Sequence, residues 1–290
     1  MDERAALARI AGTLAAAGDD AAVVDDTVIT TDMLHETTDF PGGTTRYTAG
    51  WRAVGASLSD VAAMGAAATA AVAVYAVPAF DPAELDAFLR GASDVCETVG
   101  AEYVGGDLDT HEEFTVATTA LGETDRPVRR SGASPGEKVC VTGTLGRSAA
   151  ALRHFERGES ERANELFRFE PRVRAGETLV DYATAMMDSS DGLARSLHQL
   201  AEASACGFDI EEPAVPIDGS VDETTEGPED RREAGLFFGE DFELVCTVPA
   251  DEVGDAREAC PVDLTVIGDV TDADVRADGD PLPDKGYTHN

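Results

Sequence analysis

Lysine is almost absent from this sequence: of 22 basic residues, only Lys138 and Lys285 are lysines. Against them stand 57 acidic residues, so the formal net charge is −35. Such a field repels polyanions and excludes sequence-independent binding to DNA or RNA. An acidic excess with so little lysine resembles proteins from salt-accumulating halophiles, in which concentrated salt screens the repulsion. The alternative is an ordinary acidic protein of the cytosol.

The sequence also lacks CxxC spacings and the basic start that is typical of a signal peptide. The chain has five cysteines, and none is spaced as CxxC, which excludes a zinc ribbon and argues against a disulfide framework. We expect buried thiols in a reducing compartment. The N-terminus, Met1-Asp2-Glu3-Arg4, lacks the basic region of a signal peptide, so we expect a cytoplasmic protein.

A convincing membrane span is missing as well. Residues 62–80 carry no formal charge and reach about membrane-spanning length, but they are mostly alanine and include Gly65 and Pro78. A helix end that runs into a buried strand explains this segment better. We therefore expect no membrane partner.

Several common catalytic signatures do not occur. The sequence has no GxxxxGK[ST] loop, no GxGxxG and no HExxH. Gly143 to Gly146 form a two-glycine pattern that is more typical of a simple turn than of a phosphate-binding loop. A histidine-based triad or a Walker-type nucleotide site is thus unsupported.

Helical and strand patterns alternate along both halves and predict an α+β (α/β) protein of two domains. We expect the first domain at 1–125, an exposed linker at 126–136, where Pro, Gly, Arg and Ser are frequent, and the second domain at 137–290. Residues 33–45 and 218–233 are expected to be loops, the second with at most one helical turn. The expected helices cover 4–17, 48–64, 82–99, 148–156, 173–183 and 193–203. The expected strands cover 22–24, 28–31, 70–77, 102–104, 113–121, 138–141, 208–211, 244–247 and 264–267.

Compact groups of acidic residues stand beside Gly, Ser and Thr, and we predict that the first five of the six groups lie at the ends of helices or strands. Carboxylates and hydroxyls without His or Cys nearby are hard oxygen ligands, which suit Mg²⁺ or Ca²⁺ and not zinc. Any single group is more simply a cap or a turn, and only their number strengthens the case for metal. The groups are Gly18-Asp19-Asp20, Thr30-Thr31-Asp32, Ser57-Leu58-Ser59-Asp60, Gly105-Gly106-Asp107, Asp188-Ser189-Ser190-Asp191-Gly192 and Gly239-Glu240-Asp241.

Carboxylates cannot hold phosphates directly. Like charges about 4 Å apart repel by roughly 4 kcal/mol at an effective dielectric constant of about 20. Divalent cations between the two layers reverse the sign of this interaction. Metal-bridged nucleotide binding is therefore the consistent interpretation of acidic groups beside glycines.

These motifs resemble the thiamine-monophosphate kinase family, whose fold is shared with aminoimidazole-ribonucleotide synthetase and selenophosphate synthetase. The resemblance covers nearly the whole chain, in the family's order and roughly its spacing. It rests on the six acidic groups above, on Asp39-Phe40, on the extension of the third group to Ala66 (SLSDVAAMGA), on Arg130-Ser131-Gly132-Ala133 and on Lys285-Gly286-Tyr287.

The resemblance implies a two-domain fold like that of aminoimidazole-ribonucleotide synthetase, in which the N-terminal sheet pairs across a homodimer and the C-terminal domain is α/β. It implies ATP-dependent conversion of thiamine monophosphate to thiamine diphosphate. The γ-phosphate would be transferred directly and in line, assisted by several Mg²⁺ ions.

The resemblance also assigns residues by position. Asp60, Asp107 and Asp191 would be central to catalysis. Gly106, Asp107, Arg130, Ser190 and Tyr103 would contact the nucleotide, and Asp39, Glu240 and Tyr287 would contact thiamine phosphate. The implied metal ligands are Asp20, Thr30, Thr31, Asp32, Asp60, Asp107, Asp188 and Asp191.

Two other interpretations stay open. One is a different ATP-dependent synthetase of the same superfamily. The selenophosphate enzyme would need a reactive Cys or selenocysteine near the N-terminus, whereas the first cysteine here is Cys96. The other is a non-catalytic acidic protein whose carboxylates only hold hydrated cations.

Overall fold

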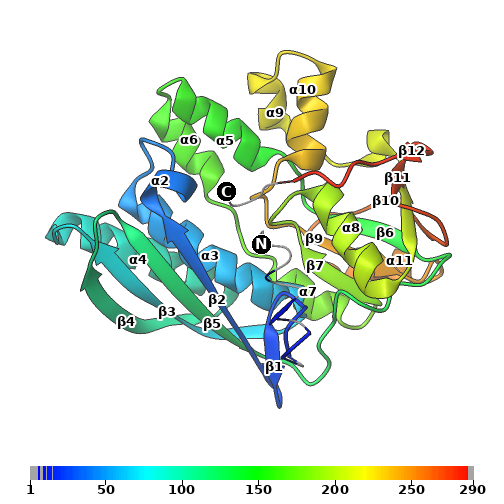
Figure 1. Ribbon diagram of the computed structural model, residues 1–290, viewed down its shortest axis with the longest axis horizontal. Helices are drawn as coiled ribbons and strands as arrows, with labels where there is room; N and C mark the ends of the chain where they lie inside the picture. Colours follow the sequence, from blue (N-terminus) through cyan, green and yellow to red (C-terminus); the bar gives the residue numbers. More distant parts are fainter. Residues whose placement is uncertain (1–5, 7–8, 11, 15, 287–290) are drawn as a thin grey trace.

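Two β-sheets with helices packed against them build the molecule, and Figure 1 shows them side by side. The computed structural model describes residues 6, 9–10, 12–14 and 16–286. One sheet comes from the N-terminal half of the chain and the other from the C-terminal half. The expected two-domain α+β architecture is confirmed, while the boundaries at 125 and 137 stay predictions.

The N-terminal sheet has five strands in the order β1-β2-β5-β3-β4. Strands β2 and β5 pair antiparallel along their whole length, from Thr27↔Glu123 to His35↔Thr115. Strands β3 and β4 are parallel, so the chain must cross over between them, and helix α4 provides the crossover. The bounds are β1 (Ala22–Val24), β2 (Thr27–His35), β3 (Ala67–Val77), β4 (Glu102–Thr110), β5 (Thr115–Glu123) and α4 (Pro82–Val99).

Helix α4 begins and ends where its sequence signals predict. The Asp81 carboxylate accepts hydrogen bonds from the backbone N–H groups of Ala83 and Glu84, and Pro82 occupies the first helical position. At the other end Gly100 adopts the left-handed conformation (φ 82°) that stops a helix.

Helix α3 (Arg46–Ala63) packs against α4 and the sheet, and small residues allow the close approach. A Cβ added at Gly50 would lie 2.3 Å from the Phe88 carbonyl oxygen, and one at Gly91 would lie 2.0 Å from that of Tyr47. The backbones of the two helices therefore touch. This contact brings the Ser57–Asp60 segment of α3 against the inner face of the sheet.

The opposite, outer face of this sheet exposes apolar side chains. Residues Val24, Ile29, Met33, Val74 and Val104 are 40–59 % exposed. Side chains on a strand alternate between the two faces, so the residues between them point inward to α3 and α4. We call this surface the outer sheet face.

The C-terminal sheet has seven strands in the order β12-β11-β8-β10-β6-β9-β7. It packs with helices α8 and α11, and α7 contacts α11 as well as α3 and β3 of the N-terminal half. The bounds are β6 (Lys138–Thr142), β7 (Ala185–Asp188), β8 (Gly207–Ile210), β9 (Leu244–Val248), β10 (Leu264–Thr271), β11 (Arg276–Ala277), β12 (Asp280–Pro281), α7 (Val173–Leu179), α8 (Leu193–Ser204) and α11 (Val253–Ala259).

Shorter helices complete the C-terminal half, and α5 packs against both α6 and α9 (Figure 1). They are α5 (Arg147–Glu156), α6 (Ser160–Phe167), α9 (Gly219–Thr224), α10 (Pro228–Arg232), a 3₁₀ turn (Glu212–Ala214) and a π turn (Glu233–Phe237). The N-terminal half adds α2 (Glu36–Asp39).

The structure corrects several boundaries expected from the sequence. Residues 33–45 are not all loop, because β2 continues to His35 and α2 follows. Helix α6 was missed, and residues 218–233, expected to be mainly loop, contain α9 and α10. These short helices carry few apolar residues, and their ends pack through tertiary contacts that periodicity does not reveal. The expected helix over 4–17 lies partly outside the described residues, and residues 12–13 form a turn.

The acidic groups also lie differently from expectation. Gly105-Gly106-Asp107 do not end a strand but continue inside β4, where the pairing with β3 skips one residue between Tyr103 and Gly105. Thr30-Thr31-Asp32 lie inside β2, and Ser57–Asp60 lie inside α3. Residues 126–136 form neither helix nor strand, but Val128 and Ala133 within them are buried, so this segment is packed more closely than an exposed linker.

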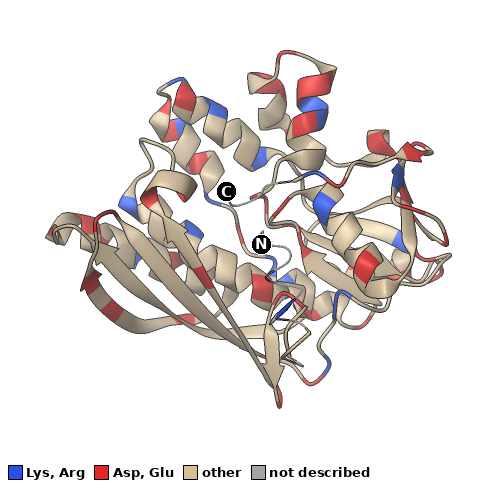
Figure 2. Ribbon diagram, in the orientation of Figure 1, with Lys and Arg blue, Asp and Glu red and all other residues tan. Residues whose placement is uncertain are grey.

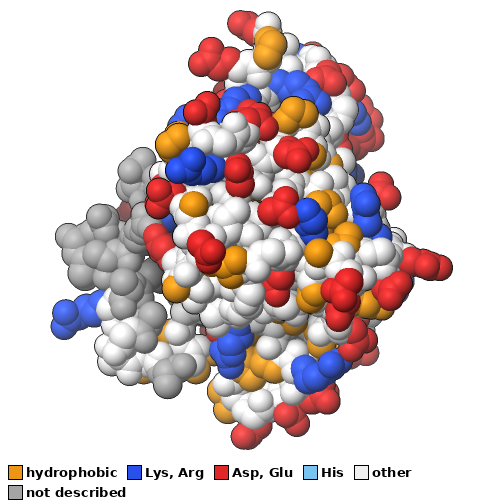
Figure 3. Space-filling model, turned by 90° about the vertical axis from the view of Figure 1, so that its right-hand side faces the viewer, with side chains coloured by type: hydrophobic (Ala, Val, Ile, Leu, Met, Phe, Trp, Pro, Cys, Tyr) orange, Lys and Arg blue, Asp and Glu red, His pale blue; other side chains and the backbone are white. Residues whose placement is uncertain are grey.

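Charge is spread over the whole molecule. Acidic residues occur on helices, strands and loops of both halves in Figure 2. On the face shown in Figure 3, acidic, basic and apolar side chains are interspersed. Among the described residues, no helix is long and apolar enough to cross a membrane.

Candidate active site

Three aspartates from three separate elements meet between the two halves. Asp20 precedes β1, Asp60 lies in the last turn of α3, and Asp188 ends β7. Each offers one carboxylate oxygen, and these oxygens lie within 4.8 Å of one another. We call these three residues the carboxylate cluster. All three were predicted metal ligands, although up to 168 residues separate them along the chain.

Hydroxyl groups hold these carboxylates in place. Thr30 Oγ1 donates to Asp60 Oδ2 at 2.5 Å, and Ser59 Oγ donates to Asp188 Oδ2 at 2.6 Å. A fourth aspartate, Asp32 on β2, accepts a hydrogen bond from Ser57 Oγ at 2.7 Å. The hydroxyls of α3 therefore orient carboxylates from both halves.

The electrostatics of the group oppose full ionisation. Burial, together with the charges of Asp32, Asp188 and Asp20, raises the pKa of Asp60 well above its usual value. Burial and Asp20 raise the pKa of Asp188 to about 7. Burial and, more weakly, Glu240 raise the pKa of Asp32. Each carboxylate is thus costly to charge without a cation beside it.

One guanidinium compensates part of this charge. Arg130 donates to both oxygens of Asp20, from Nε at 3.2 Å and Nη2 at 2.8 Å. Burial lowers the pKa of Arg130, but the adjacent Asp20 outweighs burial and raises it. Arg130 was predicted to contact the nucleotide; the structure pairs it with Asp20, a predicted metal ligand, and the nucleotide contact stays a prediction.

The donor set fits a hard divalent cation. Asp188 Oδ1 is buried, and the described part of the chain supplies it with no hydrogen bond. A buried carboxylate oxygen without a partner is unfavourable, and a metal ion would satisfy it. Oxygen-only ligands at this density match Mg²⁺ and do not match zinc.

The turn after β7 carries two more predicted residues. The Ser190 carbonyl accepts a hydrogen bond from the Glu240 N–H at 2.6 Å, so this turn is joined to the 238–243 loop. Asp191 is half-buried and lies outside the carboxylate cluster. The assignments of Ser190 to the nucleotide and Asp191 to metal stay predictions.

Thr31 and Asp107 lie away from the carboxylate cluster within one chain. The Thr31 hydroxyl donates to the Thr118 carbonyl oxygen and does not reach the cluster. Asp107 pairs with Val74, which pairs with Ala117, which pairs with Met33. Three inter-strand steps separate Asp107 from β2, which is about 14 Å. Its side chain is exposed, on an edge strand.

Tyr103, Gly106 and Asp107, all predicted nucleotide contacts, line one small pocket. Its volume is about 210 Å³, and its lining is mostly apolar, with Leu85 and Leu89 of α4 among its walls. The irregular pairing of β3 and β4 between Tyr103 and Gly105 lies in this wall. The pocket therefore gathers nucleotide candidates that lie apart from the carboxylate cluster.

The substrate candidates have different surroundings. Glu240 Oε2 accepts a hydrogen bond from Arg52 Nη2 at 2.5 Å. The charge of Glu240 also contributes to the raised pKa of Asp32. Asp39 Oδ2 accepts from the His35 N–H at 2.6 Å and from the Thr38 hydroxyl at 2.8 Å, so this carboxylate braces its own helix α2. Tyr287 lies outside the described residues.

Three residues of this region received no role from the sequence: Arg52, Ser57 and Ser59. The two serines belong to the Ser57–Asp60 group described above. Their alternation with apolar residues just before Asp60 was the sequence feature that could have predicted a role for them. No sequence feature pointed to a role for Arg52, because its partner Glu240 is 188 residues away along the chain.

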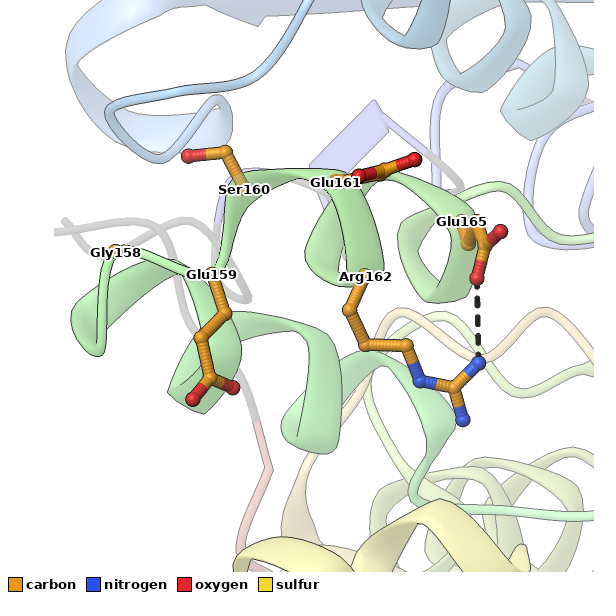
Figure 4. A pocket seen from close by; sticks show the side chains of 6 residues that line it. All are labelled: Gly158, Glu159, Ser160, Glu161, Arg162 and Glu165. Atoms are coloured by element: carbon orange, nitrogen blue, oxygen red, sulfur yellow. Dashed lines mark hydrogen bonds and ion pairs between the residues drawn. The ribbon is translucent and has the colours of Figure 1, made fainter.

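A wider surface hollow of about 640 Å³ lies elsewhere, at the start of α6. Figure 4 shows its lining, in which Arg162 is ion-paired with Glu165 at 3.3 Å. The side chains there are mainly acidic, and none of the predicted site residues is among them. We do not assign chemistry to this hollow.

Comparison with known proteins places the chain in a family. Residues 18–124 match the AIR synthase related protein, N-terminal domain, and residues 134–278 match the corresponding C-terminal domain. The thiamine-monophosphate kinase of Halobacterium salinarum is 62% identical over 100% of both chains. That of Methanospirillum hungatei is 39% identical over 91% of this chain and 88% of its own.

Solved structures agree. AaThiL complexed with AMPPCP and TMP superposes with a TM-score of 0.90 at 29% identity, covering 100% of this chain and 97% of that chain. The Escherichia coli hydrogenase maturation protein HypE, at 22% identity, 92% and 86% coverage and a TM-score of 0.71, shares the fold alone. The sequence matches and the superposition point the same way, and the chain belongs to the thiamine-monophosphate kinase family.

Proposed function

We propose that this protein transfers the γ-phosphate of ATP to thiamine monophosphate and yields thiamine diphosphate and ADP. The carboxylate cluster carries the proposal, because three aspartates from both halves offer oxygens within 4.8 Å of one another, an arrangement that suits a cation, in a fold whose relative binds an ATP analogue and TMP. Phosphate binding at such an acidic site requires cations.

Asp20, Asp60 and Asp188 would hold Mg²⁺, with Thr30 and Ser59 orienting two of the carboxylates. Asp32, Thr31, Asp107 and Asp191 are the further ligands that we propose. When bound, Mg²⁺ supplies positive charge that offsets the mutual repulsion of the phosphates.

The transfer needs no general base from the protein. An oxygen of the acceptor phosphate is already ionised at neutral pH, so it forms the new bond to the γ-phosphorus as the bond to the β,γ-bridging oxygen breaks. ADP leaves with that electron pair. The chain's own task is to align the two phosphates in line and to exclude water.

The nucleotide base would occupy the pocket beside Tyr103 and Gly106. Its apolar lining and volume of about 210 Å³ suit a flat heteroaromatic ring. Ser190 and Arg130 are the candidates for phosphate contacts, since both lie next to the cluster.

On the substrate side, Glu240 is the strongest candidate. Its carboxylate is held by Arg52 and lies near enough to Asp32 for their charges to interact, and a carboxylate suits the cationic thiazolium ring of thiamine. Asp39 and Tyr287 remain proposals by position.

A homodimer would complete the site. The outer sheet face is apolar, and Asp107 projects on an edge strand about 14 Å from its own β2. If the sheets of two copies pair through this face, Asp107 of one copy would serve the carboxylate cluster of the other. Burial of Met33, Val74 and Val104 would stabilise the pair.

A coupled assay tests the function. ADP release should require ATP, thiamine monophosphate and Mg²⁺ together, at molar KCl. Thiamine diphosphate should appear in equal amount by chromatography. ADP release that is independent of thiamine monophosphate would refute the proposal, as would activity with aminoimidazole-ribonucleotide precursors or selenide instead.

A further inference from the structure

Arg52 is a fully buried cation on a helix whose other buried residues are small or apolar. It lies in the second turn of α3, between Ala49 and Ala53, and is 0% exposed. Removal of a guanidinium from water is unfavourable unless hydrogen bonds and an opposite charge replace the water. Its partners therefore indicate why the chain keeps a charge there.

The partners of Arg52 all belong to the C-terminal half. Nη1 donates to the Phe167 carbonyl oxygen at 2.7 Å. Nη2 donates to the Glu240 carbonyl oxygen at 3.0 Å and to Glu240 Oε2 at 2.5 Å. The guanidinium carbon also lies 3.6 Å from the centroid of the Phe167 ring. Arg52 thus connects α3 to one side chain of the 238–243 loop.

That loop has a conformation that needs external support. Glu240 and Phe242 have φ values of 72° and 55°, in the left-handed region that side chains rarely adopt. The Glu240 N–H is bonded to Ser190, and the Ser148 hydroxyl donates to the Glu240 carbonyl oxygen at 2.6 Å. The backbone of Glu240 is therefore fixed from three sides, and Arg52 also fixes its carboxylate.

The Glu240 carboxylate lies near enough to Asp32 for the two negative charges to repel. Arg52 holds Oε2, and the described residues supply no hydrogen bond to Oε1. One oxygen is anchored and the other is left for a ligand.

We propose that Arg52 is a positioning residue that holds the Glu240 carboxylate in place to contact the cationic ring of the substrate. This inference rests on the proposed function. The ligand class is a phosphate ester that carries a cationic heteroaromatic ring. Arg52 itself does not contact the ligand, and its effect passes through Glu240.

Four variants test the proposal by steady-state kinetics in molar KCl: Arg52→Met, Arg52→Lys, Glu240→Gln and the double variant Arg52→Met/Glu240→Gln. Arg52→Met should raise the KM for thiamine monophosphate about tenfold or more, the size of a lost charge-assisted hydrogen bond, with the KM for ATP within about twofold. Arg52→Lys should recover most of this loss because it retains the charge.

The double variant distinguishes positioning from general support. If Arg52 acts through Glu240, adding Arg52→Met to Glu240→Gln should change the KM for thiamine monophosphate by no more than about twofold. Arg172→Met is the matched control. Arg172 makes a two-pronged ion pair with the neighbouring Glu243 at 2.6 and 2.7 Å, so its loss disturbs the same loop without touching Glu240.

Two outcomes would refute the contact between Glu240 and the substrate, and this inference with it. They are an inactive wild type and a Glu240→Gln variant with a normal KM for thiamine monophosphate. A raised KM in Glu240→Gln beside a normal one in Arg52→Met overturns the positioning role alone. Additive effects in the double variant, or equal changes of both KM values in Arg52→Met and Arg172→Met, would show that Arg52 only stabilises the fold. Calorimetric titration of thiamine monophosphate without ATP gives the same comparison independently of turnover.

Discussion

Asp60 lies where the repulsion in the cluster is greatest. Burial, followed by the charges of Asp32, Asp188 and Asp20, raises its pKa, whereas the Thr30 hydroxyl and the positive charge of Arg130 favour its ionised form. A side chain in such a position lowers the stability of the folded protein unless a cation is present. Stability and activity should therefore respond to its loss in opposite directions.

Asp60→Asn keeps the shape of the side chain and removes its charge. We expect turnover to fall by at least about a hundredfold at saturating Mg²⁺, because one cation ligand is weakened. The melting temperature in EDTA should be unchanged or higher, because one repelling charge is gone. Exposed Asp251→Asn is the control and should change neither quantity. Near-normal turnover of Asp60→Asn would exclude it as a metal ligand.

Among the helices, α5 shows how a tertiary contact supplies a cap that its own sequence lacks. Its N-cap is Gly146, which has no side chain to accept a hydrogen bond. The Asp241 carboxylate takes this role from across the fold, accepting from the Gly146 N–H at 2.5 Å and the Ser148 N–H at 2.9 Å. Burial nevertheless raises the pKa of Asp241 to about 7.

This raised pKa predicts a pH dependence. Between the ordinary value of 3.8 and about 7 the folded state binds the Asp241 proton and the unfolded state does not, so the free energy of unfolding falls as pH rises through this window. Asp241→Asn removes the contribution. The advantage of the wild type over Asp241→Asn should therefore shrink by about 2 kcal/mol from pH 5 to pH 7.

Urea unfolding in EDTA and about 2 M KCl, which screens surface charge, would measure this difference at each pH. The other carboxylates are common to both proteins and cancel in the comparison. A difference that is constant, or that grows with pH, would show that the two backbone hydrogen bonds keep Asp241 ionised.

At the scale of the whole molecule, the net charge of −35 dominates. Acidic residues occur throughout both halves in Figure 2, and on the face shown in Figure 3 they are interspersed with fewer basic side chains. Their repulsion extends about one Debye length, which grows from under about 3 Å above 1 M salt to about 10 Å at 0.1 M. The fold should therefore depend on concentrated salt.

Dialysis from about 3 M to below about 0.1 M KCl should lower the melting temperature, because the screening of the negative charges is lost. The melting temperature would be measured by far-UV circular dichroism. Sucrose at matched water activity serves as the control for non-ionic effects. A melting temperature that stays the same or rises at low salt would contradict the halophilic interpretation of the composition.

The shared site makes a further prediction for the dimer. Asp60→Asn and Asp107→Asn should each inactivate the enzyme alone. Mixed after partial unfolding and reassembly, they should regain about a quarter of wild-type activity, because half the dimers are mixed and each has one intact site. Differential tagging would show that mixed dimers have formed. If activity does not recover although they have, Asp107 acts in the site of its own chain or in no active site.

The amino-acid sequence alone determined the features that depend on local chemistry. The acidic composition, the caps of α4, the six acidic groups and the family resemblance can all be seen without coordinates. For the same reason the short helices α6, α9 and α10 escaped prediction, since their apolar contacts come from distant segments and not from their own periodicity.

Only the tertiary structure decided which charges meet. It joined Asp20, Asp60 and Asp188, paired Arg130 with Asp20, and paired Arg52 with Glu240. It also placed Asp107 on an edge strand, three strand spacings from β2. Strand register and helix packing set the distances between these charges. The electrostatic interaction depends on the distance in space between two groups and not on their separation along the chain.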